Sequence, residues 1–228
     1  MSIFRLFLAT CLYTVAATAG AQSYHITDQW KIGGEGGWDY LVSDDAAHRL
    51  YVTHSSRVEV IDTKTGKVIG AVTGLKSTHG VALNPDGMTG YISDGAGNAV
   101  VFFDRQNLSA LATVQVGTNP DGIAFEPMTK TVWAFNGRSK DVSVLDTQSK
   151  VVVATIALPG KPEFPQVDDH GSVLVNIEDK NEIVKLDCPS KKAVAAWPLE
   201  GCESPSGMAI DRAQHEWGRY RESLIGPG

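Results

Sequence analysis

An aspartate recurs at a nearly constant interval along the chain, each time at the end of a short apolar run. The four aspartates are Asp62, Asp104, Asp146 and Asp187, and the steps between them are 42, 42 and 41 residues. A fixed period of this length indicates one structural unit that is repeated along the chain. The fold of these 228 residues must therefore be built largely from copies of that unit.

When the copies are aligned, other positions also recur at nearly the same interval, and each set of aligned positions forms a column. One column holds large side chains, a second holds a polar residue followed by glycine, and a third closes each copy with small and β-branched residues. Their members are Tyr51, Tyr91, Trp133 and Val175; His79-Gly80, Asp121-Gly122 and Ser206-Gly207; and residues 70–73, 112–115, 154–157 and 195–198. The period therefore involves the whole unit and not the aspartate alone.

Each copy predicts four short β-strands, because runs of alternating β-branched and aromatic residues are separated by turn residues. In the third copy we expect strands at 121–126, 131–135, 141–146 and 150–157. The stretch Asn84-Pro85-Asp86-Gly87 is typical of a tight turn, since proline presets its own φ and glycine accepts a positive φ. No segment has a convincing helical period.

Four antiparallel strands in each unit, with a period near 42, predict a propeller blade, because radial repetition protects the edges of small twisted sheets. A β-solenoid would need a shorter period, and a sandwich of this length would lack the repeated columns. We therefore expect an all-β propeller of four-stranded antiparallel blades. The predicted repeats are 34–74, 75–116, 117–158 and 159–200, with a partial fifth repeat at 201–211.

Three stretches carry a family resemblance. Residues 51–54 (YVTH), 58–62 (VEVID) and 151–156 (VVVATI) resemble the YVTN repeat of the YncE-like propellers, which are secreted or periplasmic bacterial proteins. The resemblance covers roughly residues 33–211. It implies a closed ring of seven blades, so that about four and a half to five blades of a probable seven are present.

The repeat pattern breaks after residue 211, because residues 212–228 show no alternation. Residues 24–33, in contrast, look like the last strand of a blade that lacks its first three strands. Our hypothesis is a C-terminally truncated or frame-shifted chain, whose open edges favour self-association. In the alternatives, the tail is a genuine cap or two chains complete one ring.

The N-terminus predicts export from the cytoplasm. Residues 1–21 combine one basic residue, a long apolar stretch and a small-x-small end, which is typical of a signal peptide cleaved after Ala21. A lipoprotein alternative rests on Cys11, although Thr10 precedes it and the apolar run continues beyond it. No later segment reaches the roughly 18 apolar residues of a membrane-spanning helix. We expect a periplasmic or extracellular protein.

Charge and cysteine content exclude some further classes. Loss of the signal peptide leaves 19 basic and 26 acidic residues, a net charge of about −7, which disfavours nucleic acid as a partner. Cys188 and Cys202 are too few for a disulfide-stapled small fold. We expect them at opposite ends of an outer strand, where a bridge between them is disfavoured.

Eight aligned polar positions are the candidate ligand or metal site. The entries to the first strands hold Asp39, His79, Asp121 and Glu163, and the loops after the second strands hold His54, Asp94, Asn136 and Glu178. Their oxygens suit Ca²⁺ or another divalent metal, and the histidines also admit a transition metal. The competing interpretation, which we favour, is that these residues cap turns. Trp38, at a loop entry, is the candidate for ligand stacking.

The sequence contains no Gly-x-Ser-x-Gly, His-Glu-x-x-His, Cys-x-x-Cys-His or Walker-type motif. We therefore expect a secreted, non-catalytic propeller that binds a protein partner or a small ligand on its loop-rich face. One alternative is a metal-dependent hydrolase similar to lactonase propellers. In that enzyme Glu163, Asn136 and Asp121 would hold Ca²⁺ and His79 or His54 would act as general base. The other is an accessory propeller of a periplasmic redox enzyme.

Overall fold

The computed structural model describes residues 25–210. The predicted signal peptide with Cys11, and the predicted tail at 212–228, lie outside the described residues. The chain divides into two units, Met1–Lys31 and Ile32–Gly228, and the whole fold described below belongs to the second.

The second unit contains four antiparallel sheets, each of four strands in chain order. The first sheet comprises β1 (Trp38–Asp44), β2 (Arg49–His54), β3 (Arg57–Asp62) and β4 (Lys67–Val72). The second comprises β5 (Thr78–Leu83), β6 (Thr89–Asp94), β7 (Ala99–Asp104) and β8 (Ala110–Gln115). The third comprises β9 (Pro120–Glu126), β10 (Thr131–Asn136), β11 (Asp141–Asp146) and β12 (Val151–Ala157). The fourth comprises β13 (Pro162–Val167), β14 (Ser172–Ile177), β15 (Glu182–Asp187) and β16 (Lys192–Pro198).

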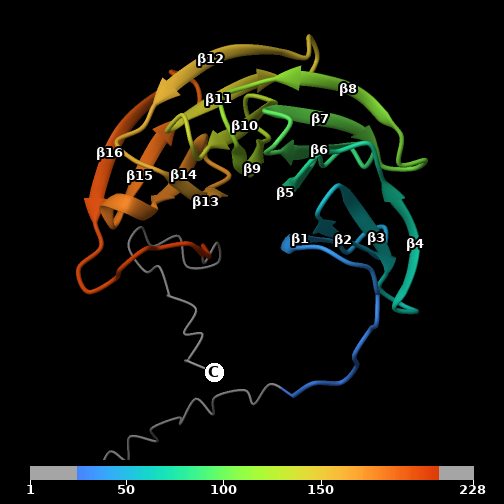
Figure 1. Ribbon diagram of the computed structural model, residues 1–228. Coiled ribbons are helices and arrows are strands. Elements are labelled where there is room, and N and C mark those ends of the chain that lie inside the picture. Colours follow the sequence, from blue (N-terminus) through green and yellow to red (C-terminus); the bar gives the residue numbers. More distant parts are fainter. Residues whose placement is uncertain (1–24, 211–228) are drawn as a thin grey trace, which may run out of the picture. The chain divides into compact units, whose positions relative to one another are not determined.

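Successive sheets meet through their first strands. Strand β5 contacts both β1 and β9, and β13 contacts β9, while the fourth strands lie on the outside of the unit (Figure 1). Four-stranded meanders stacked in this way are blades of a β-propeller. The predicted fold class is therefore confirmed. Within residues 25–210 the only helical segment is one 3₁₀ turn, Glu178–Lys180.

Burial along the strands follows from this stacking. In β10 every residue is buried, because the middle strands of a blade are covered on both faces by neighbouring blades. In β12, at the outer edge, exposed and partly buried residues alternate strictly. Alternation with period two is expected of a strand that has one face on a core and one in solvent.

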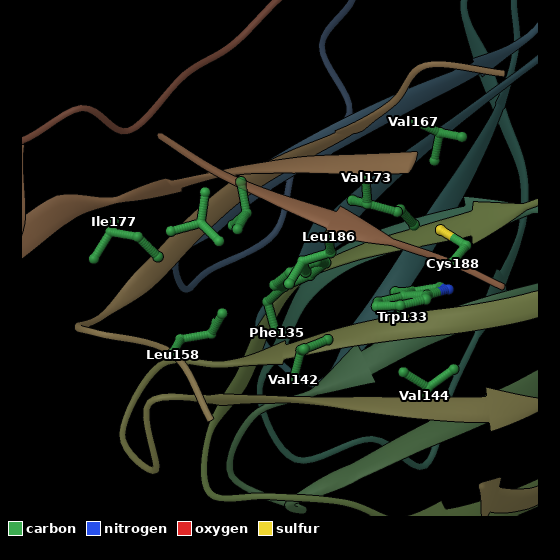
Figure 2. Close-up of a cluster of buried hydrophobic side chains, with 13 residues drawn as sticks. Trp133, Phe135, Val142, Val144, Leu158, Val167, Val173, Ile177, Leu186 and Cys188 are labelled. Carbon is green, nitrogen blue, oxygen red and sulfur yellow. The ribbon is translucent and has the colours of Figure 1, made fainter. Parts of the chain in front are cut away.

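Hydrophobic clusters between adjacent blades hold the unit together. Figure 2 shows the cluster between the third and fourth blades, in which Trp133 and Phe135 of β10 pack against Val173 and Leu186 of the next blade. Two similar clusters join the first blade to the second and the second to the third. Each fully buried large side chain contributes about 1.5–3 kcal/mol through the hydrophobic effect. Blade-to-blade packing is therefore the main source of stability in the described unit.

The strands expected for the third copy agree with the structure to within one residue. The fourth copy differs from the expected alignment. Leu174, not Val175, occupies the column of Tyr51 and Trp133, because Leu174 pairs with Lys185 as Trp133 pairs with Val144. The cause is a shorter connection, since β14 begins 41 residues after β10 where a constant period would give 42.

The predicted partial fifth copy has no assigned strand within residues 201–210. Its backbone nevertheless lies against the fourth blade, because Asn176 Nδ2 donates to Gly207 O at 3.0 Å and Gln166 Nε2 donates to Met208 O at 3.3 Å. Residues 25–33, predicted as an outer strand, also have no assigned strand. Within the described residues Cys188 and Cys202 do not form a disulfide bond with each other. Among the described residues, the structure has no helix that is long and apolar enough to span a membrane.

Candidate functional site

A β-bulge interrupts the first strand of every blade at the same place. Regular pairing with the second strand skips residues 39–40, 79–80, 121–122 and 163–164, directly after the first residue of each strand. A bulge redirects the side chains at the point where it interrupts a ladder. The residues at the first bulge position are Asp39, His79, Asp121 and Glu163. The four predicted entry positions are thus structurally equivalent.

Three of these four side chains converge. One ligand atom each from Asp39, His79 and Asp121 can be chosen so that all lie within 4.8 Å of one another. The His79 ring donates from Nδ1 to Asp39 Oδ2 at 2.7 Å. This hydrogen bond, supported by the nearby charge of Asp121, raises the pKa of His79 above its ordinary value although burial opposes the shift. The structure therefore brings together one imidazole and two carboxylates from three successive blades.

The fourth entry residue, Glu163, borders this group. Burial raises the pKa of both Asp121 and Glu163. The nearby charge of Asp39 adds to the rise at Asp121, and that of Asp121 adds to the rise at Glu163. Lys161 offsets part of this effect, because its Nζ lies 2.6 Å from Glu163 Oε1. An excess of poorly hydrated carboxylates attracts cations, and an imidazole adds a nitrogen ligand for a transition metal.

An aromatic side chain occupies the second bulge position at two of the four blades. Tyr40 and Phe164 meet edge to face there, with ring centroids 5.1 Å apart. Burial, followed by the nearby carboxylates of Asp121, Glu163 and Asp39, raises the Tyr40 pKa. The other two blades have Gly80 and Gly122 at this position. At Gly122 a Cβ would lie 2.5 Å from Glu163 O, so the neighbouring blade excludes a side chain.

The loop positions after the second strands behave differently, and two of them are structural. His54 is fully buried beneath Trp38, and its Nε2 bonds Glu35 O at 2.9 Å. Asp94 Oδ1 accepts from the backbone N–H groups of Lys76 and Ser77 at 3.0 and 2.8 Å. Asp94 thus caps the loop before β5, whereas His54 packs beneath Trp38. Within the described residues neither side chain is hydrogen-bonded to Asp39, His79 or Asp121.

Asn136 and Glu178 also fall outside the cluster. Asn136 is fully buried and donates from Nδ2 to Asp141 Oδ1 and Ser143 Oγ, at 2.6 and 3.0 Å. Glu178 lies one residue beyond the equivalent position, which Ile177 occupies at the end of β14. The side chain of Glu178 reaches Lys161 instead, with Oε2 2.5 Å from Nζ. The shorter connection before β14 accounts for this shift.

Sequence reasoning did not identify Tyr40 or Lys161. Tyr40 follows Asp39 where two other copies have glycine, and this departure from the column was the available signal. Lys161 directly precedes β13, at a position where the other copies have Gly37, Ser77 and Asn119. Such copy-specific residues are visible only after the blades are aligned by register. Trp38 remains 44% exposed beside the cluster, with one ring face stacked on His54.

Among the described residues, Asp39, His79 and Asp121 are the ones placed to hold a metal ion together. Ca²⁺ takes six to eight oxygen ligands, more than these three side chains supply, whereas an ion such as Zn²⁺ binds with four ligands including histidine nitrogen. Glu163 is not one of these three residues, and its Oε1 is bonded by Lys161 Nζ at 2.6 Å. The arrangement defines the chain as a propeller protein with a polar cluster at one end of its first strands.

Comparisons with known proteins support the fold. No protein-family model matches the chain. No curated protein matches it. Among solved structures, it is similar to hydrazine synthase of Kuenenia stuttgartiensis, at 19% identity and a TM-score of 0.69, over 82% of this chain and 55% of that one. It is also similar to U3-55K, at 11% identity and a TM-score of 0.65, over 73% and 53% of the two chains. The chain thus spans about half the length of each, and at these identities the likeness concerns the fold alone.

Proposed function

We propose that this chain is a non-catalytic binding propeller that holds a divalent cation at the cluster of Asp39, His79 and Asp121. The observation that carries the proposal is the convergence of three equivalent bulge positions, whose ligand atoms lie within 4.8 Å of one another. Imidazole and carboxylate are common ligands of Zn²⁺, Mn²⁺ and related ions. The cation would either fix the surrounding loops or present an open position to a small ligand.

The hydrolase alternative receives less support than the binding proposal. It requires Asn136 as a cation ligand, but Asn136 is fully buried and its side chain bonds Asp141 and Ser143, with no bond to the described residues Asp39, His79 or Asp121. It also requires His54 or His79 as a base, whereas His54 is buried against Trp38 and His79 is bonded to Asp39. The proposed cation site needs neither Asn136 nor His54, and it uses His79 as a ligand and not as a base.

Calorimetric titration of the purified, chelator-treated protein with Zn²⁺, Mn²⁺ and Ca²⁺ tests the proposal. We expect one site per chain, with Zn²⁺ or Mn²⁺ bound more tightly than Ca²⁺. Asp121→Asn should weaken binding at least about tenfold, because one charged ligand is lost. Asp94→Asn is the matched control, since Asp94 caps a turn, and its cation affinity should equal that of the wild type. No binding of any of the three ions would refute the proposal.

We further propose that the protein is exported and YncE-like, with the loop-rich face presented to a partner protein or a small ligand. The predicted signal peptide at 1–21 and the YVTN-type stretches support this. Fractionation of expressing cells, with N-terminal sequencing of the mature protein, tests it. We expect a periplasmic or secreted protein that begins at Gln22. A cytoplasmic protein that retains Met1 would contradict export.

A further inference from the structure

The residue directly before the first strand is neutral in three blades and cationic in the fourth. Gly37, Ser77 and Asn119 precede β1, β5 and β9, and Lys161 precedes β13. The four positions are equivalent, because the backbone carbonyl of each accepts an N–H from the loop after the second strand, at 2.7–3.0 Å. Only the fourth copy places a cationic side chain beside the Asp39–His79–Asp121 cluster in this way.

The side chain of Lys161 binds two carboxylates. Its Nζ lies 2.6 Å from Glu163 Oε1 and 2.5 Å from Glu178 Oε2. The Glu163 side chain is only 10% exposed, and it occupies the entry position that holds Asp39, His79 and Asp121 in the other blades. The hydrogen bond to Glu163, followed by that to Glu178, raises the pKa of Lys161, so the ammonium group stays charged.

The Lys161 backbone makes bonds of its own, separate from those of its side chain. The loop is held through the Lys161 backbone, whose N–H donates to Asp179 Oδ1 at 2.7 Å and whose carbonyl accepts from Glu178 N–H at 2.9 Å. Asp179 is in turn bonded by Lys140 Nζ. A neutral side chain at position 161 therefore preserves these backbone bonds while it frees Glu163.

We propose that Lys161 is a specificity-determining residue, an internal cation that occupies Glu163 and restricts the site to Asp39, His79 and Asp121. This inference rests on the proposed cation site. A resident ammonium competes with an incoming ion for Glu163 and also repels it. Hard ions that need many oxygen ligands lose most by this competition. Lys161 thus biases the site against Ca²⁺ and toward ions that accept an imidazole nitrogen.

The experiment measures Ca²⁺ and Zn²⁺ affinity for the full chain and for Lys161→Gln, Lys161→Met and Lys161→Arg. We expect either neutral variant to bind Ca²⁺ at least about tenfold more tightly, because a like charge is removed and a carboxylate is released. The increase in Zn²⁺ affinity should be smaller, and the Ca²⁺ and Zn²⁺ affinities of Lys161→Arg should stay within about threefold of those of the wild type. Adding Glu163→Gln to Lys161→Gln should abolish the gain. Lys140→Gln, which removes the same charge from a nearby loop, is the control and should leave both affinities unchanged.

The outcomes separate the two proposals. If the wild type binds a cation and both neutral variants bind Ca²⁺ no more tightly, the role of Lys161 is refuted while the cation site stands. If the wild type binds none of the ions but Lys161→Gln binds Ca²⁺ through Glu163, the proposed function is refuted and the exclusion by Lys161 is supported. If no variant binds any ion, both are refuted. An equal gain in Lys140→Gln would also refute the specific role of Lys161.

Discussion

Trp38 lies flat on His54, with the ring centroids 3.6 Å apart and the ring planes inclined by 16°. The pair joins the first residue of β1 to the last residue of β2, which are partners in the strand register. His54 is fully buried, and Arg57 Nη2 lies 2.8 Å from its Nδ1. The contact places His54 in the supporting structure of the loop, whereas His79 belongs to the polar cluster.

The two histidines should respond oppositely to alanine substitution. His54→Ala removes buried hydrogen bonds and the stacking contact, so we expect the free energy of unfolding to fall by about 2–4 kcal/mol. Its cation affinity should change less than about threefold. His79→Ala should weaken cation binding at least about tenfold with a much smaller loss of stability. Urea unfolding gives the free energy of unfolding, and calorimetry gives the cation affinity. A fully folded His54→Ala variant that has lost cation binding would contradict the separate roles of the two histidines.

A buried ion pair joins the first and second blades. Arg105 Nη2 bonds Asp44 Oδ2, and Arg105 Nη1 also donates to Asn84 O at 2.7 Å. The two charged side chains are 8% and 6% exposed. Asp44→Ala leaves a buried guanidinium without its partner, so we expect a loss of about 3–5 kcal/mol in urea unfolding.

Lys140→Ala is the control for this prediction, because the Lys140–Asp179 pair is also close, at 2.7 Å, but is largely exposed. Exposed pairs contribute about 0–1 kcal/mol. Equal losses in the two variants would show that burial does not govern these ion pairs.

The close approach of β9 and β13 at Gly122 gives a third prediction. A Cβ there would lie 2.5 Å from Glu163 O and 2.6 Å from Pro165 Cδ, so Gly122→Ala should destabilise the protein by about 1–3 kcal/mol through overpacking. At Gly137 the nearest atoms would be 3.6 Å from the Cβ, and Gly137→Ala should leave stability nearly unchanged. Thermal unfolding compares the pair. A stable Gly122→Ala variant would mean that the two blades are less tightly packed than the structure shows.

The raised pKa of His79 gives two pH dependences of opposite sign. Metal ligation needs a neutral imidazole, so cation affinity should fall as the pH falls through the raised pKa, which lies above the ordinary value near 6.5. Without a cation, the raised pKa favours the protonated folded state. That contribution to stability is fully present below about pH 6.5 and is lost as the pH rises through the folded pKa.

Cation titration and urea unfolding, repeated between about pH 5.5 and 8.5 in steps of about half a pH unit, test this prediction. They measure how cation affinity and folding stability change with pH around the usual histidine pKa. His79→Gln should abolish the pH dependence of stability in this window. If the slope persists in His79→Gln, another group accounts for it.

The repeat and the four strands of each blade were predictable, because both depend on local patterns that recur within each copy. The equivalence of Asp39, His79, Asp121 and Glu163 was predictable for the same reason, since all four follow the start of a first strand. Their convergence depends on bulges, which leave no clear mark in a single sequence. Glu178 was misaligned because one residue is missing before β14, and a shift of one residue alters which side chain ends a strand.

The features that distinguish one blade from another were the hardest to predict. Tyr40 and Lys161 depart from their columns, and a search for repeats emphasises what is common to all copies. The stacking of Trp38 on His54 likewise depends on a contact between two strands that only the register defines. The candidate site therefore combines shared positions, which the sequence indicated, with copy-specific residues, which it did not.

The bulges of β1, β5, β9 and β13 have a consequence for how such a protein can change. Each bulge removes one side chain from the regular pairing of its strand, and the hydrophobic clusters between the blades do not include Asp39, His79, Asp121 or Glu163. A substitution at one of these positions alters the polar cluster without repacking a core. Each blade therefore supplies one position outside the packed clusters, and under the proposed function new ligand preferences can arise there while the scaffold remains intact.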